Sequence, residues 1–168
     1  MNHGKTDKNI ESRLQSERSV IVLSALDEIK TKGNISYLPL MFDLLKSQPD
    51  LEIEKEIKNI LGSLKVEEAT SVIAEALQSD QYRPIRKDLI TACWQNGLDY
   101  KEHLPVFVDM IIEEEWETGF EAFTVIENLK VLPKQDVIDE CVIKIKNSLS
   151  EASDKKRYFL EEILALIC

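Results

Sequence analysis

The chain has 168 residues, of which 43% are apolar and only five are glycine and five proline, so its composition argues against disorder and against a turn-rich all-β fold. Its three cysteines form no CxxC pair and fit no zinc spacing, which favours a reducing compartment over a disulfide scaffold. The net charge is −10, and residues 1–66 carry ten charges of each sign, so the whole excess lies in residues 67–168. An acidic chain repels phosphate backbones, which disfavours a nucleic-acid partner.

The first ten residues, MNHGKTDKNI, are polar and lack the apolar stretch of a secretory signal. No apolar run approaches the roughly 18 residues that a membrane span needs. We therefore expect a cytoplasmic protein without a membrane segment. It would consist of a polar tail over 1–9 and a single domain over 10–168.

Windows rich in Glu, Lys, Leu and Ile, and poor in Gly and Pro, predict helices along the whole chain. Short Gly-, Pro- or Asn-containing stretches, such as KGN at 32–34 and QPD at 48–50, separate these windows. The predicted helices cover about 10–31, 35–47, 51–64, 67–79, 82–96, 101–114, 116–130, 134–149 and 154–167.

Two sets of apolar triplets recur along these helices, and in each triplet the three residues share one helical face. The first set is Val22/Leu26/Ile29, Ile53/Ile57/Ile60, Ile85/Leu89/Ala92 and Gly119/Phe123/Ile126, with lags of 31, 32 and 34 residues. The second is Leu38/Met41/Leu45, Thr70/Ile73/Leu77, Leu104/Phe107/Ile111 and Ile138/Cys141/Ile145, with lags of 32, 34 and 34 residues. Unrelated amphipathic helices would not keep a common lag, so the pattern predicts a repeated unit of helix A, turn and helix B.

The segment YLPLMFDLLKSQPDLEIEKEIKNILGSL, residues 37–64, resembles a HEAT repeat. The matching positions in this and the next two units are Leu38-Pro39, Asp50, Leu61-Gly62, Asp80, Ile85-Arg86 and Leu104-Pro105. The resemblance covers roughly residues 35–167, and the lag is shorter than the usual 40–47 residues, as in the shorter bacterial form. It implies an all-α, right-handed superhelix (α-solenoid) of about four HEAT-like helix pairs plus an N-terminal helix, with the B helices lining a concave face.

On the B helices, the side opposite the core triplets is expected to carry a binding row that runs from basic to acidic. Its candidate residues are Lys55, Asn59, Arg83, Lys87, Trp94 and Glu121. Tryptophan and arginine are common anchors of protein interfaces, which makes Trp94 the central candidate. The alternative is that Trp94 packs between neighbouring repeats. Tyr82 and Trp116 hold equivalent positions at the starts of two B helices, where we expect them to pack on the A–B turns.

A run of glutamates between the third A and B helices forms a candidate acidic docking edge, which comprises Glu113, Glu114, Glu115 and Glu117. It is either a solvated surface or a docking site for a basic partner. A metal site is disfavoured because the chain has no ExxH pair and no EF-hand loop.

No catalytic set is recognisable in the sequence. His103 precedes a Leu-Pro pair without a second titrating motif nearby, and Cys93 and Cys141 lie in apolar stripes. No phosphate-binding loop, nucleophile elbow or HExxH motif occurs, so neither an enzyme nor a cofactor is expected.

Three functions fit the sequence, and the oligomeric state stays open. The first is a non-enzymatic scaffold that binds a peptide or protein through the concave B-helix face. The second is an acidic antagonist, of the kind that immunity proteins exemplify, which neutralises a basic partner. The third, a HEAT-like enzyme of the DNA glycosylase type, would need a basic groove that an acidic chain does not suggest.

Overall fold

The computed structural model describes residues 5–168, and this part of the chain contains ten α-helices, three short 3₁₀ helices and no strand. The all-α class predicted from the sequence is confirmed. In chain order the helices are α1 (Lys8–Leu14), α2 (Ser19–Lys32), η1 (Ile35–Tyr37), α3 (Leu38–Lys46), α4 (Leu51–Gly62), α5 (Ala69–Gln78), η2 (Asp80–Ile85), α6 (Arg86–Asn96), η3 (Lys101–His103), α7 (Leu104–Glu113), α8 (Trp116–Glu127), α9 (Gln135–Ser148) and α10 (Asp154–Ile167).

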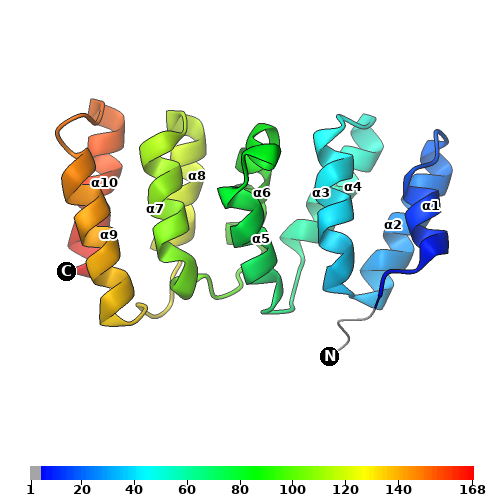
Figure 1. Cartoon of the computed structure of the whole chain (residues 1–168), viewed down its shortest axis with the longest axis horizontal. Helices are drawn as coiled ribbons and strands as arrows, with labels where there is room; N and C mark the ends of the chain where they lie inside the picture. Colours follow the sequence, from blue (N-terminus) through cyan, green and yellow to red (C-terminus); the bar gives the residue numbers. More distant parts are fainter. Residues whose placement is uncertain (1–4) are drawn as a thin grey trace.

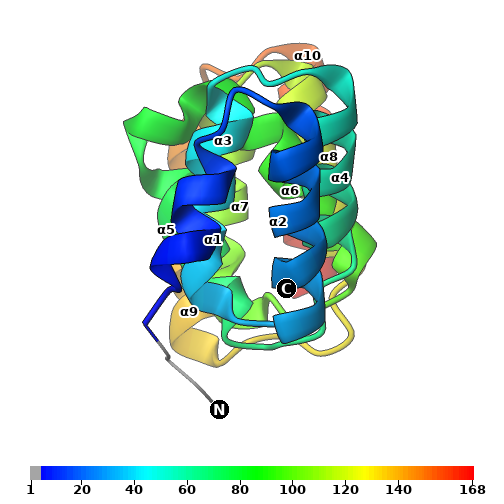
Figure 2. The same cartoon turned by 90° about the vertical axis from the view of Figure 1, so that its right-hand side faces the viewer.

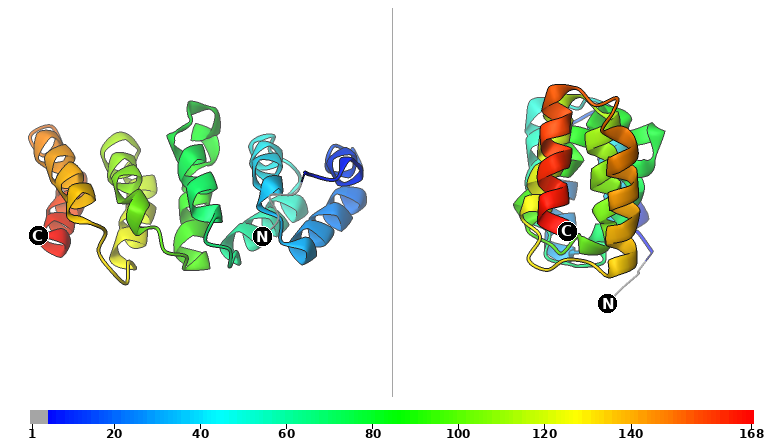
Figure 3. Two further views of the ribbon diagram at one scale, coloured as in Figure 1. Left: turned by 60° about the horizontal axis from the view of Figure 1, so that its bottom comes forward. Right: turned by 90° about the vertical axis from the view of Figure 1, so that its left-hand side faces the viewer.

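The helices form pairs that stand side by side in chain order along the molecule (Figure 1). Viewed along its long axis, the molecule has two layers, with the odd-numbered helices in an A row and the even-numbered helices in a B row (Figure 2). Each B-row helix from α2 to α10 contacts the next one in its row, and α3, α5, α7 and α9 do the same in the A row. Figure 3 shows the same succession from two further sides.

The N-terminal region differs from the prediction of one helix over about 10–31, because α1 and α2 are separate helices that pack against each other. A continuous helix would place Glu17 or Arg18 on the face that Ile10 and Leu14 bury, one turn after Leu14. The chain turns instead, and Ser16 Oγ accepts a hydrogen bond from the backbone N–H of Arg18. The helix α1 therefore supplies the A helix that the prediction lacked, and it begins at Lys8, inside the expected polar tail; residues 1–4 of that tail lie outside the described part.

Helix ends follow ordinary capping chemistry. Asp50 caps α4 by accepting a hydrogen bond from the backbone N–H of Ile53 at 3.1 Å. Gly33 and Gly97 end α2 and α6 with φ values of +64° and +65°, a left-handed conformation that glycine adopts without strain. Pro39 and Pro105 stand in the first turns of α3 and α7, where a missing N–H costs no helical hydrogen bond.

The repeated triplets form the core between the two rows. Every residue of all eight triplets is buried, including Thr70 and Gly119. Gly119 allows close packing, because a Cβ built there would lie 3.5 Å from the Cα of Ile111 in α7.

Polar side chains link each pair to the next. Lys30 of α2 pairs with Glu56 of α4 at 3.1 Å, and Lys58 of α4 pairs with Asp88 of α6 at 2.8 Å. Farther along, Lys144 of α9 binds both carboxylate oxygens of one aspartate of α7, at 2.9 and 2.7 Å. These bonds fix the offset between neighbouring pairs, on which the position of any surface that spans them depends.

Candidate functional site

Trp94 lies on the outer side of α6 and keeps 38% of its surface exposed, so it does not pack fully between repeats. Its indole Nε1–H donates to Glu121 Oε2 of α8 at 2.7 Å. The same oxygen accepts a hydrogen bond from Thr91 Oγ1 at 3.0 Å. The ring thus has a satisfied polar end and is held across the junction of two helix pairs.

Three further residues of the predicted row are exposed on α6, which carries Trp94, and on its B-row neighbour α4. Lys87 is on α6 one turn before Thr91, and the backbone carbonyl oxygen of Lys87 lies 2.9 Å from Thr91 Oγ1, as a second acceptor near that hydroxyl. Lys55 and Asn59 stand one turn apart on the neighbouring α4, and both are exposed. Within residues 5–168, neither Lys55 nor Lys87 has an ion-pair partner. We call the set Lys55, Asn59, Lys87, Thr91, Trp94 and Glu121 the Trp94 surface.

Arg83, the remaining member of the predicted row, points elsewhere. It lies in η2, where its side chain is exposed and its Nε is 3.4 Å from Glu114 Oε1. It therefore reaches toward the turn between α7 and α8 instead of accompanying Trp94.

Glu114 does not belong to an exposed docking edge, which corrects the prediction for this residue. Its side chain is 11% exposed and accepts a hydrogen bond at 2.5 Å from Nη1 of Arg86, whose own side chain is 5% exposed. The cause is local: α7 ends at Glu113, and Glu114 adopts an extended conformation (φ −89°, ψ 170°) instead of continuing the helix. Glu113, Glu115 and Glu117 are exposed and have no ion-pair partner in the described chain.

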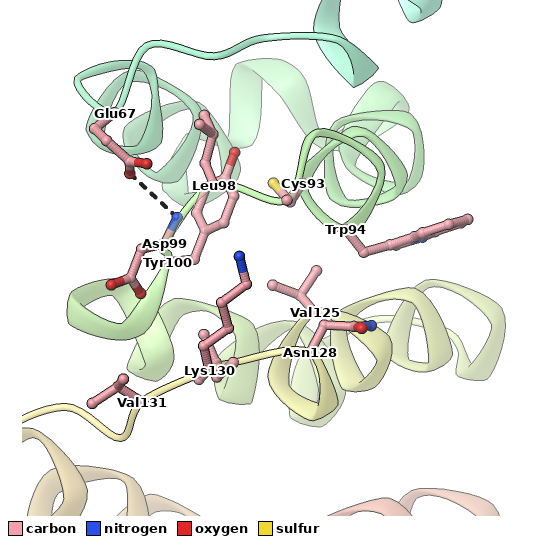
Figure 4. Close-up of a pocket in the computed structure, with 12 residues that line it drawn as sticks. Glu67, Cys93, Trp94, Leu98, Asp99, Tyr100, Val125, Asn128, Lys130 and Val131 are labelled. Atoms are coloured by element: carbon pink, nitrogen blue, oxygen red, sulfur yellow. Dashed lines mark hydrogen bonds between the residues drawn. The ribbon is translucent and has the colours of Figure 1, made fainter.

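A cavity of about 310 Å³ opens next to Trp94, between the C-terminal ends of α6 and α8 (Figure 4). Its lining residues are Glu67, Cys93, Trp94, Gly97, Leu98, Asp99, Tyr100, Val125, Asn128, Leu129, Lys130 and Val131. Glu67 Oε2 accepts a hydrogen bond from the backbone N–H of Asp99 at 3.2 Å, which ties the loop after α6 to the preceding pair. The Lys130 side chain extends toward the centre of the lining residues. No sequence pattern predicts this cavity, because two loops far apart in the chain form it.

The titratable groups near the site do not form a nucleophilic set. Burial raises the pKa of the Cys93 thiol to about 12, so this thiol stays protonated at neutral pH. Burial lowers the pKa of His103, whose Nε2 lies 3.4 Å from Ser71 Oγ. Among the described residues no carboxylate hydrogen-bonds the other ring nitrogen of His103, the contact that orients the base in a catalytic triad.

The two aromatic residues expected at the A–B turns make contacts between pairs instead. Tyr82 packs edge-on against Phe42 of the preceding pair, with ring centroids 5.6 Å apart, and its hydroxyl donates to Asp43 at 3.2 Å. Lys155 of the following pair holds its ammonium 4.1 Å from the ring centroid of Trp116. The position in the repeated pattern therefore predicts where Tyr82 and Trp116 lie in the chain, but not which residues their rings contact.

Within residues 5–168, no three His, Cys, Asp or Glu side chains converge in a way that would hold a metal ion. No helix in the same range has the length and apolar character needed to cross a bilayer. The sequence matches no model of a known protein family, and a search of characterised proteins finds no significant relative.

Proposed function

We propose that the chain is a HEAT-like α-solenoid that works as a non-enzymatic protein-binding module, with the Trp94 surface as its binding site. The common lag of 31 to 34 residues and the two parallel rows of helices support the repeat architecture. Stacked pairs of this kind offer an extended row of helix faces, which suits a peptide or the edge of a folded protein.

The observation that carries the proposal is the state of Trp94. The Trp94 side chain is partly exposed, and its indole N–H is already bonded to Glu121. A partner that covers the ring therefore pays little further free energy to remove water from that N–H. The bond also restricts the side chain before binding, which reduces the entropy that association costs. A tryptophan held in this way fits the description of an interface anchor, whose truncation typically costs 2 kcal/mol or more, roughly a thirtyfold loss of affinity.

The groups around Trp94 define what a ligand would present there. Lys87 lies two turns before Trp94 on α6 and Lys55 lies on the neighbouring α4, and neither ammonium group has an ion-pair partner among the described residues. The cavity beyond Trp94 has a mixed lining, with apolar Leu98 and Val125 beside polar groups such as Lys130. A peptide with an acidic side chain followed by a large apolar one would meet the lysines and the ring together. The cavity of about 310 Å³ would take the apolar side chain.

The test is selection of peptides from a displayed random library, followed by fluorescence polarisation of each labelled peptide with purified variants. Trp94→Ala should lower the affinity about thirtyfold, and Lys87→Glu should lower it about tenfold for acidic peptides. Ile143→Ala and Lys146→Glu are the matched controls, because both residues are exposed on α9 and belong neither to the Trp94 surface nor to the lining of its cavity. Selected peptides that bind the Trp94 and Lys87 variants as well as the original chain would overturn the proposal.

A further inference from the structure

A second surface lies at the seam between α8 and α10, where five aromatic rings gather. We call it the aromatic seam, and its members are Trp116, Phe120, Phe123, Tyr158 and Phe159. Phe123 and Phe159 are buried and stacked, with centroids 5.1 Å apart. The other three rings remain 41% (Trp116), 48% (Phe120) and 58% (Tyr158) exposed.

The exposed rings are not required to close the core. Phe120 lies over Phe159 with ring centroids 6.0 Å apart, and Tyr158 flanks the same ring at 5.9 Å. The buried rings therefore already fill the junction of α8 and α10, and the exposed ones form an outer layer. Aromatic side chains supply large contact areas at interfaces, so this layer is available for a partner.

The chain itself shows which chemistry the Trp116 ring accepts, since the ammonium of Lys155 stands 4.1 Å from its centroid. A cation over an indole face is attracted by the electron density of the ring. Lys155 has no carboxylate partner within residues 5–168, so the ring is its main contact.

Exposed carboxylates near the seam in sequence also favour a cationic ligand. Glu117 follows Trp116 on α8, and Glu113 and Glu115 precede it, all exposed and without an ion pair in the described chain. On α10, Glu161 and Glu162 follow Tyr158 by one turn and are exposed as well. Against these five exposed carboxylates stand three cations that precede Tyr158 on α10, namely Lys155, Lys156 and Arg157, so the charge near the seam in sequence remains negative.

We propose that the aromatic seam binds a lysine- or arginine-rich segment of a protein partner. One cation of that segment replaces Lys155 over Trp116, its aliphatic stem crosses Phe120, and further cations meet Glu117 and Glu162. An acidic or phosphate-bearing partner would be repelled by the same carboxylates. The inference rests on the proposed function only in that it takes the chain to bind proteins; the seam is a separate surface, and its basic ligand differs from the acidic peptide proposed for the Trp94 surface.

The probe is a short labelled peptide that alternates lysine and serine, titrated with the purified chain by fluorescence polarisation. Phe120→Ala keeps the net charge and should weaken binding about fivefold or more. Ile143→Ala, an exposed apolar residue on α9 outside the seam, should leave the affinity unchanged. Equal affinities for the original chain and Phe120→Ala would mean that net charge alone attracts the peptide, and would overturn the inference.

A second pair of variants separates the ring from the charge. Lys155→Met and Lys146→Met each remove one positive charge, but Lys155 covers Trp116 and Lys146 is exposed on α9. Lys155→Met should therefore tighten binding about fivefold more than Lys146→Met does. Equal tightening in the two variants would contradict the displacement of Lys155.

Binding of the lysine peptide should be insensitive to Trp94→Ala, which distinguishes this inference from the proposed function. Suppose that Trp94→Ala loses binding of the library peptides, while Phe120→Ala binds the lysine peptide as tightly as the original chain. That combination would leave the proposed function standing and would remove the inference. A dimer in sedimentation that Phe120→Ala dissociates would assign the seam to a second copy of the chain and would also remove it.

Discussion

The ion pair between Arg86 and Glu114 allows a sharp test of the energetics of the stack. Arg86 Nη1 lies 2.5 Å from Glu114 Oε1, and the side chains are 5% and 11% exposed. Asp80 is the other carboxylate near Arg86, at 3.6 Å from Nη2, but its side chain is almost fully exposed. Glu114→Gln keeps the shape of the side chain and removes the buried carboxylate charge that is paired with Arg86.

The magnitude follows from the burial of the pair. Breaking a buried pair by removing one partner typically costs 3–5 kcal/mol, because the other charge is left uncompensated. The amide oxygen of glutamine can still accept a hydrogen bond from Arg86, so we expect a loss near the lower end, about 3 kcal/mol of the free energy of unfolding. With an m-value of about 2 kcal/mol per molar urea, the midpoint of unfolding should fall by roughly 1.5 M.

The assay is urea unfolding followed by circular dichroism. Glu113→Gln is the matched control, because it makes the same change one residue earlier at an exposed position and should shift stability by less than about 0.5 kcal/mol. Adding Arg86→Met to Glu114→Gln should recover part of the loss, since it removes the uncompensated charge. A Glu114→Gln protein as stable as the Glu113→Gln control would refute the reasoning.

Three further predictions concern stability and reactivity. Asn96→Ala should lower the free energy of unfolding by about 3 kcal/mol in the same urea titration, because this buried amide hydrogen-bonds Leu61 O, Tyr100 Oη and the backbone N–H of Leu98. Asn59→Ala, at an exposed position, should cost almost nothing, and equal losses in the two variants would contradict this account. A thiol reagent at pH 8 should react with one thiol per native chain, that of the exposed Cys168, and with three thiols after unfolding. The reason is that burial raises the pKa of Cys93 and Cys141 to about 12, and a second fast-reacting thiol in the native chain would contradict this prediction. Since burial lowers the pKa of His103, the unfolded chain takes up a proton first, so stability should fall as pH drops below about 6.5, and His103→Gln should flatten that fall; identical slopes would refute the assignment.

The interior of the fold was predictable because it depends on spacing alone. Residues such as Leu26 and Ile57 are buried because the apolar members of each triplet share one helical face, and the residues of all eight triplets are buried in this way. The break between α1 and α2 was also readable, since Glu17 and Arg18 interrupt the apolar face that Ile10 and Leu14 begin. The prediction missed it because it gave weight to the later triplet and not to the charged turn before it.

The surface was less predictable because it depends on where individual side chains reach. Glu113 and Glu115 are exposed while Glu114 between them is nearly buried, and no periodicity distinguishes the three. The extended backbone at Glu114 and a buried arginine in the preceding pair decide the difference. The aromatic seam was not predictable for a related reason: Phe120 of α8 packs against Phe159 of α10, and the two residues lie nearly forty positions apart in the chain.

The bonds between neighbouring pairs bear on how the Trp94 surface could respond to a partner. The ion pairs Lys30–Glu56 and Lys58–Asp88, which link neighbouring helix pairs, are partly exposed, so each contributes at most about 1 kcal/mol to the free energy of unfolding. The buried triplets must therefore supply most of the stability of the stack, and the polar bonds chiefly set orientation. The bond from Trp94 to Glu121 is of this second kind, because it fixes an exposed ring across the junction of α6 and α8 without adding to the core. A ligand on Trp94 would thus contact two helix pairs at once, and the geometry of their junction would enter its affinity.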